Sequence, residues 1–128
     1  MKRTFVVCVL CIIGSFVWGQ GYGGEMFSLS NGYFAYVEIM NCYTPAGARE
    51  EWERRINLAY YTQKLPWVEE PSKDLLELEK EALSHYNIRP FQVYTIIFQR
   101  NGKNEYICFG NTLGADSSVM LHGFFKVQ

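Results

Sequence analysis

The chain has 128 residues, with 12 Lys and Arg against 13 Asp and Glu, which gives a formal net charge of −1. It has no excess of basic residues with which to displace counterions from a phosphate backbone, so its composition argues against nucleic acid as a partner. The length suits one small domain with a single core and leaves no room for a second.

Residues 1–19 have the layout of a secretory signal peptide. Two basic residues precede the apolar run 5–13, and small residues lead up to Gly19. The run is shorter than the roughly 20 apolar residues that a spanning helix needs, so we expect cleavage rather than an uncleaved anchor. Cleavage is expected after Gly19, with Gly21 as the alternative, and no stable membrane insertion should remain after removal of the signal. The sequence therefore predicts a secreted or periplasmic protein.

The mature chain, 20–128, is predicted to be a single α+β domain with a flexible tail at 20–24. Removing the two basic residues of the signal leaves 10 basic against 13 acidic residues, a net charge of about −3. The mature chain is therefore more acidic than the full sequence.

A β-hairpin is predicted first, with strands at 26–30 and 33–40. The dipeptide Asn31-Gly32 between them favours a tight type I′ turn, because both positions of that turn need positive φ angles. Glu38 alternates with apolar residues in the second strand. We expect its face of the strand to be solvated; on a covered face it would need a partner such as Arg89 or Arg100.

Two amphipathic helices follow. Thr44 and Pro45 are typical of a helix N-cap and first turn, and four residues at helical spacing form an apolar face. The Glu51 and Arg55 pair is expected on the solvated side. Ser72 caps a second helix that ends near residue 87, before a proline. The apolar faces comprise Ala48, Trp52, Ile56 and Ala59 in the first helix, and Leu75, Leu78, Ala82 and Tyr86 in the second.

The C-terminal part is predicted to be three strands. Strands 91–99 and 104–109 are joined by Asn101-Gly102, and a two-residue turn would pair Ile97 with Tyr106 and Thr95 with Cys108. A polar segment, 110–117, leads to a last strand at 118–127. We expect a small single α+β domain, with an antiparallel sheet of about five strands in the order ββ-αα-βββ and the pair of helices packed on one face.

Cys42 and Cys108 are the two cysteines that remain after signal removal. An oxidising compartment permits a disulfide between them, which makes the pair a candidate bridge. Two buried free thiols, or a nucleophilic Cys108 with His122 as its base, are the alternatives. The spacing of His, Cys and carboxylates matches no metal site, and no cofactor motif is present, so we expect neither a metal nor a cofactor.

Two regions are candidate binding surfaces. Tyr60 and Tyr61 are adjacent on a helix, so they cannot both face the core, and with Trp67 they form an aromatic region suited to a partner. Capping of the core by these rings is the competing interpretation, and in a domain of this size we favour it. The segment 110–118 has the composition of a binding loop, although a plain connection between strands is the interpretation that we favour. Its candidate ligand-binding residues are Asn111, Thr112 and Asp116.

Three function classes fit this sequence. The first is a secreted or periplasmic interaction module without catalytic activity, which binds an unknown protein or an extracellular polymer. The second is a small cysteine-dependent hydrolase that uses Cys108 and His122. The third is a carrier of a small apolar ligand between the helices and the sheet. We expect the first, because it needs no catalytic constellation and the sequence shows none.

Overall fold

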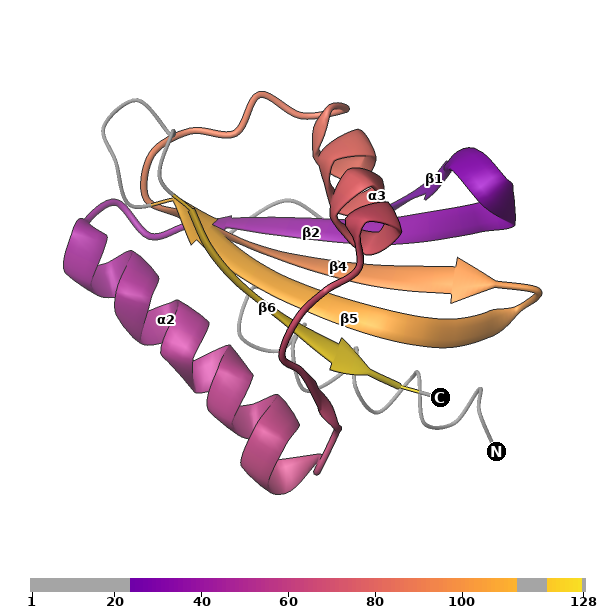
Figure 1. Cartoon of the computed structure of the whole chain (residues 1–128). Helices are drawn as coiled ribbons and strands as arrows, with labels where there is room; N and C mark the ends of the chain where they lie inside the picture. Colours follow the sequence, from indigo (N-terminus) through magenta and orange to yellow (C-terminus); the bar gives the residue numbers. More distant parts are fainter. Residues whose placement is uncertain (1–23, 113–119, 128) are drawn as a thin grey trace.

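A computed structural model describes residues 24–112 and 120–127 of the chain. Six antiparallel strands form one sheet in the order β1-β2-β4-β5-β6-β3, and a helix covers each face (Figure 1). The predicted antiparallel α+β class is confirmed, with one strand more than expected. The strands are β1 (Glu25–Ser28), β2 (Tyr33–Asn41), β3 (Trp67–Val68), β4 (Gln92–Arg100), β5 (Lys103–Thr112) and β6 (Met120–Lys126); the helices are α2 (Pro45–Asn57), which continues into the π-helical turn η2 (Leu58–Thr62), and α3 (Lys73–Leu83).

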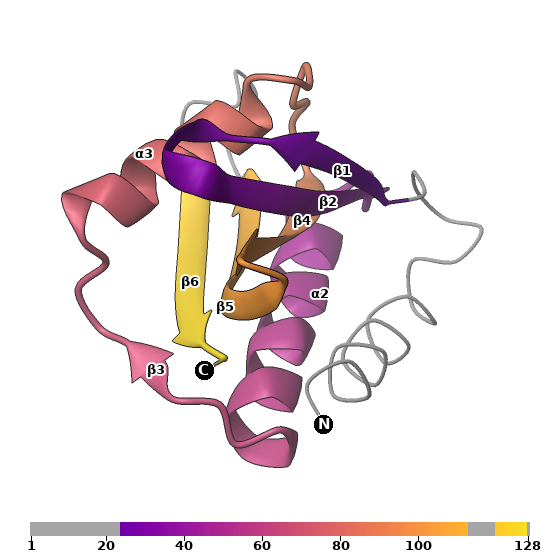
Figure 2. The ribbon, with the colours of Figure 1, turned by 90° about the vertical axis from the view of Figure 1, so that its right-hand side faces the viewer.

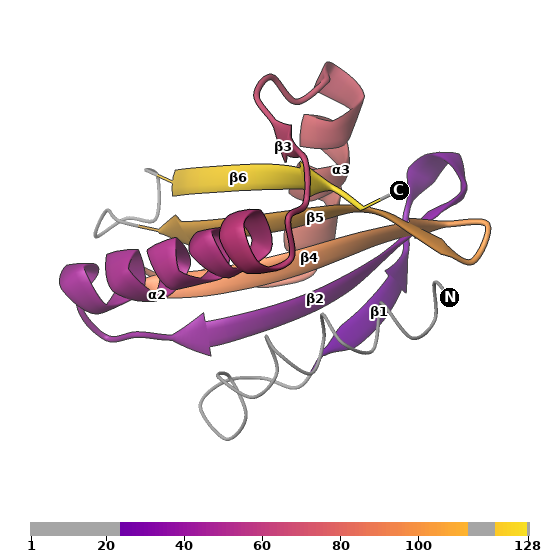
Figure 3. The same cartoon turned by 90° about the horizontal axis from the view of Figure 1, so that it is seen from below.

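The two helices lie on opposite faces of the sheet, so the prediction that they pack on one face was wrong. Phe125 belongs to the core that contains Ala59, next to α2, whereas its neighbour Phe124 belongs to the core that contains Ala82 of α3. Neighbouring residues of a strand point to opposite faces, so these are two separate cores. Figure 3 shows α2 in front of the sheet and α3 behind it. This arrangement explains why β4 is buried along most of its length.

The additional strand, β3, lies in the connection between the helices. The chain passes the β6 edge of the sheet on its way from one face to the other, and there Trp67 pairs with Phe125 and Val68 with Phe124 (Figure 2). The carbonyl of Pro66 also accepts a hydrogen bond from the amide of Lys126, at 3.0 Å. Two residues between turns are too few to show the alternating pattern of a strand, so the sequence indicated only a connector.

The β4–β5 hairpin contains a bulge that the sequence did not predict. The turn at Asn101 and Gly102 has positive φ angles of 55° and 75°, as expected for Asn-Gly. The pairing then shifts between Phe98 and Gln99, so Ile97 lies opposite Ile107 rather than Tyr106. One extra residue moves every following side chain to the other face of the strand. Cys108 therefore pairs with Ile96 and faces α3, not α2.

The predicted N-caps of both helices and the predicted Asn-Gly turn of the first hairpin are confirmed. The Thr44 hydroxyl accepts a hydrogen bond from the amide of Gly47, and the Ser72 hydroxyl accepts one from the amide of Leu75. Asn31 and Gly32 have the predicted positive φ angles, although β1 ends at Ser28, two residues earlier than expected. The second helix likewise ends at 83, before the predicted position.

Within residues 24–112 and 120–127, no helix is long and apolar enough to span a membrane. The predicted signal peptide at 1–19 and nearly all of the predicted tail lie outside the described residues.

Candidate functional site

The aromatic residues singled out in the sequence lie at an open groove beside the sheet edge. Tyr60 of the π-helical turn and Trp67 of β3 line it together with Glu69, and its volume is about 570 Å³. Tyr60 keeps 47% of its surface exposed and Trp67 keeps 41%. The described side chains that line this aromatic groove are thus two rings and one carboxylate.

The indole of Trp67 is held in place by its neighbours. Its ring packs edge-on against Phe125, with centroids 5.0 Å apart. It also lies over Gly123: a Cβ atom at that position would come within 3.2 Å of the indole and 2.7 Å of the Ile56 side chain. The absence of a side chain at 123 therefore lets the indole lie close to β6. Its remaining surface faces the groove.

The π-helical turn determines where the two tyrosines point. Ala59 is buried, whereas Tyr60 and Tyr61 are both exposed. Their rings contact each other edge-to-face, with centroids 4.8 Å apart. Of the two, Tyr60 lines the aromatic groove. The prediction that the adjacent tyrosines do not share the core holds, and the structure leaves both outside it.

The predicted binding loop is shorter than expected, because β5 continues to Thr112. Asn111 and Thr112 are completely buried strand residues. The Asn111 amide donates to the carbonyl of Ala48 at 3.5 Å, and the Thr112 hydroxyl donates to the carbonyl of Arg89 at 2.7 Å. Their side chains therefore join the ends of strands and helices inside the protein. Asp116 lies outside the described residues.

Cys42 and Cys108 are both free thiols, so the candidate disulfide is not formed in the structure. Cys42 follows the end of β2, whereas Cys108 lies in the middle of β5 and faces α3. Burial raises the pKa of the Cys42 thiol and raises that of Cys108 well above its usual value. The structure corresponds to the alternative in which the two cysteines are unpaired thiols.

A buried carboxylate, Glu79 of α3, joins three strands of the sheet. It accepts hydrogen bonds from the Tyr94 hydroxyl at 2.7 Å and from the Cys108 thiol at 3.3 Å. The His122 Nδ1 atom lies 3.0 Å from both carboxylate oxygens. The hydrogen bond to Glu79 raises the pKa of His122, against the opposing effect of burial. We call these four residues the Glu79 cluster.

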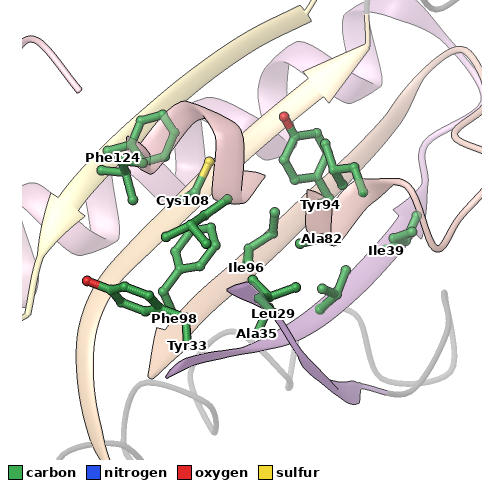
Figure 4. Close-up of a cluster of buried hydrophobic side chains, with 14 residues drawn as sticks. Leu29, Tyr33, Ala35, Ile39, Ala82, Tyr94, Ile96, Phe98, Cys108 and Phe124 are labelled. Atoms are coloured by element: carbon green, nitrogen blue, oxygen red, sulfur yellow. The ribbon is translucent and has the colours of Figure 1, made fainter. Parts of the chain in front are cut away.

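Figure 4 shows Tyr94 and Cys108 in the apolar core on the α3 side of the sheet. The Tyr94 ring lies across Gly110, where a Cβ atom would approach it to 2.1 Å, so only glycine at 110 lets the hydroxyl reach α3. The sequence did not indicate this role for Glu79. The available signal was its position four residues after Leu75, on the apolar face of the helix.

A second charged cluster is buried under α2. Arg55 is 1% exposed and bonds to Glu51 at 2.8 Å and to the Thr95 hydroxyl at 2.7 Å. Glu38 lies on the same side, where it accepts a hydrogen bond from Tyr36 at 3.0 Å. Burial raises the pKa of the Glu38 carboxyl, opposed by that hydrogen bond and by the charge of Arg55. The predictions of a solvated Glu38 face and a solvated Glu51–Arg55 pair were wrong.

The two buried clusters are less accessible to solvent and to ligands than the aromatic groove is. Glu79 and Arg55 use their hydrogen-bonding groups within the protein, whereas the groove opens to solvent. In the described part of the chain, no group of three His, Cys, Asp or Glu side chains is arranged to hold a metal ion.

Comparison with protein-family models, with curated proteins and with solved structures finds no significant match.

Proposed function

We propose that this protein is an exported, non-catalytic binding module whose contact site is the aromatic groove. The observation that carries the proposal is the exposure of Tyr60 and Trp67 side by side at the groove, 47% and 41%, in a domain whose other large rings mostly fill the cores. Tyrosine and tryptophan offer large amphipathic area at low entropic cost, which makes them preferred contact residues.

Preorganisation also supports a binding role. The Trp67 ring is fixed by Phe125 and by the close approach of Gly123, so little side-chain freedom is lost when a ligand covers its open side. A ring exposed without such support would sample several rotamers. The groove therefore has a contact residue that is already oriented before binding.

The geometry favours this function over a cysteine hydrolase. A nucleophilic cysteine needs a base that holds it as thiolate. Here the Cys108 thiol and the His122 ring each bond to Glu79, and burial keeps the pKa of Cys108 high. The thiol is thus a hydrogen-bond donor to a carboxylate. An apolar carrier would need a compartment between a helix pair and the sheet, but the helices lie on opposite faces.

The test uses protein labelled with 5-fluorotryptophan, in which each indole gives its own fluorine resonance. The Trp67→Phe variant assigns the groove resonance, and Trp52, whose indole donates to the carbonyl of Phe109 at 2.9 Å, serves as the internal reference. The probes are a lysine decapeptide, a glutamate decapeptide and a neutral cello-oligosaccharide. We expect at least one probe to move the Trp67 resonance in a saturable manner while the Trp52 resonance stays in place.

Two variants provide the matched control. Tyr60→Ala removes a groove ring, and Phe34→Ala removes a ring that is similarly exposed on β2. Binding should weaken about tenfold in the first and change less than twofold in the second, as expected for one contact aromatic. A Trp67 resonance that responds to none of the probes, or equal effects of the two variants, would contradict the proposed function.

Export is tested separately by the intact mass of protein recovered from a host secretion pathway. A mass that matches a chain beginning at Gln20 supports the proposal, because Val17 and Gly19 occupy the two small-residue positions of the expected cleavage site. A mass that matches a chain beginning at Met1 would contradict export with signal removal.

A further inference from the structure

We infer that the aromatic groove takes a lysine or arginine side chain of a partner protein, placed over the rings of Trp67 and Tyr60 and paired with Glu69. This inference rests on the proposed function and names its ligand. It follows from the chemistry of the three lining residues and from the charge of the chain around them.

The rings provide the first part of the site. The face of an indole or phenol carries partial negative charge, and a cation within about 6 Å of the ring centre is attracted to it; tryptophan is the strongest of the aromatic side chains in this respect. The Trp67 ring meets Phe125 at 86°, so the two rings are not stacked, and 41% of the Trp67 surface stays exposed. An ammonium or guanidinium group fits that chemistry.

Glu69 provides the second part. It is an exposed carboxylate that lines the groove with the two rings. A carboxylate next to aromatic rings disfavours an anionic ligand and gives a cation a direct partner. Lysine and arginine stems are also apolar, so they can cover the rings while the charged end reaches Glu69.

The charge of the whole chain acts in the same direction. The mature sequence has 10 basic and 13 acidic residues, so it attracts a basic partner at long range. The site is open, and its ion pair stays hydrated, so affinity should be modest and sensitive to salt.

The experiment measures the affinity of a fluorescently labelled lysine decapeptide for the exported protein by anisotropy. Glu69→Gln and Glu70→Gln form a matched pair: both remove one exposed negative charge, but of the two only Glu69 lines the groove. We expect Glu69→Gln to weaken binding about three- to fivefold and Glu70→Gln less than twofold, in the range measured for exposed ion pairs. Trp67→Leu keeps an apolar side chain without a π face and should weaken binding about tenfold.

Several outcomes would overturn the inference. They are equal effects of Glu69→Gln and Glu70→Gln, equal binding of a glutamate decapeptide, or no binding of the lysine peptide at millimolar concentration. If the cello-oligosaccharide then still moves the Trp67 resonance, the groove remains a binding site and only its cationic ligand is wrong. If no probe moves that resonance, the proposed function fails as well.

Discussion

Replacing Arg55 with Ala is expected to lower the free energy of unfolding by about 3–5 kcal/mol, the usual cost of removing one partner from a buried ion pair. The guanidinium is 1% exposed and binds Glu51 and Thr95. Its removal takes from the buried Glu51 carboxylate one of its two arginine partners, the other being Arg54, and also removes the nearby positive charge that lowers the pKa of Glu38. Urea denaturation of the two proteins measures the difference.

Arg49→Ala is the control for this substitution. Arg49 lies on the same helix, but its side chain is 55% exposed and its contact with Glu53 is 4.0 Å long. Exposed pairs of this kind contribute about 0–1 kcal/mol, so stability should hardly change. If Arg55→Ala lowers the free energy of unfolding no more than Arg49→Ala does, the buried charge does not stabilise the contact between α2 and the sheet.

Replacing Glu79 with Ala is the second change with a large expected effect. The Tyr94 hydroxyl, the Cys108 thiol and the His122 ring would lose their shared acceptor inside the α3 core. Loss of an acceptor by a buried donor costs about 1–3 kcal/mol, and it affects the buried Tyr94 and Cys108 more than His122, whose side chain is 36% exposed, so we expect a net loss of about 3 kcal/mol. Glu77→Ala, an exposed position of α3, should change stability by less than about 0.5 kcal/mol.

The Glu79 cluster also determines how stability depends on pH. The folded-state pKa of His122 is raised, so its contribution is fully present below the unfolded pKa of about 6.5 and is lost as pH rises through the folded value. Cys108 and Tyr94 also have raised values, chiefly through burial, so folding resists their ionisation and stability falls further in the alkaline range. Urea midpoints should therefore fall as the pH rises above about 6.5. If the urea midpoint of His122→Gln depends on pH near neutrality as steeply as that of the original protein, this role of His122 is contradicted.

Local patterns in this sequence predict local structure well. Asn-Gly dipeptides, the caps at Thr44 and Ser72, and the apolar helical faces all depend on neighbouring residues, and the structure confirms them. The side of the sheet that each helix covers depends on where the chain crosses an edge. That crossing occurs at β3, whose two residues carry no periodic signal.

The bulge at the β4–β5 hairpin explains why the relation of Cys108 to the rest of the site could not be predicted. In an unbulged hairpin Cys108 lies opposite Thr95, on the α2 side. With the extra residue it lies opposite Ile96 and reaches Glu79. The buried charges were missed for a related reason: Glu79 and Arg55 have partners far along the chain, and helical periodicity alone assigns charged residues to the solvent.

For the candidate site, the sequence indicated Tyr60 and Trp67 but not the carboxylate that lines the groove with them. Glu69 was indistinguishable from Glu70 in a polar connector, and the structure separates them because Glu69 lines the groove. Asn111 and Thr112 had the composition of a loop, yet strand pairing with β4 and β6 buries both. Composition therefore pointed to rings that the structure leaves exposed, and assigned the two polar residues to the wrong kind of element.

One measurement bears most directly on the groove: the fluorine spectrum of the two described tryptophans during titration with the lysine decapeptide. A binding module that holds a basic side chain at Trp67 should show a saturable shift of the Trp67 resonance, a fixed Trp52 resonance, and a weaker response in Glu69→Gln than in Glu70→Gln. A spectrum in which the Trp67 resonance does not move, or moves only together with that of Trp52, would contradict a site for a basic side chain at this groove.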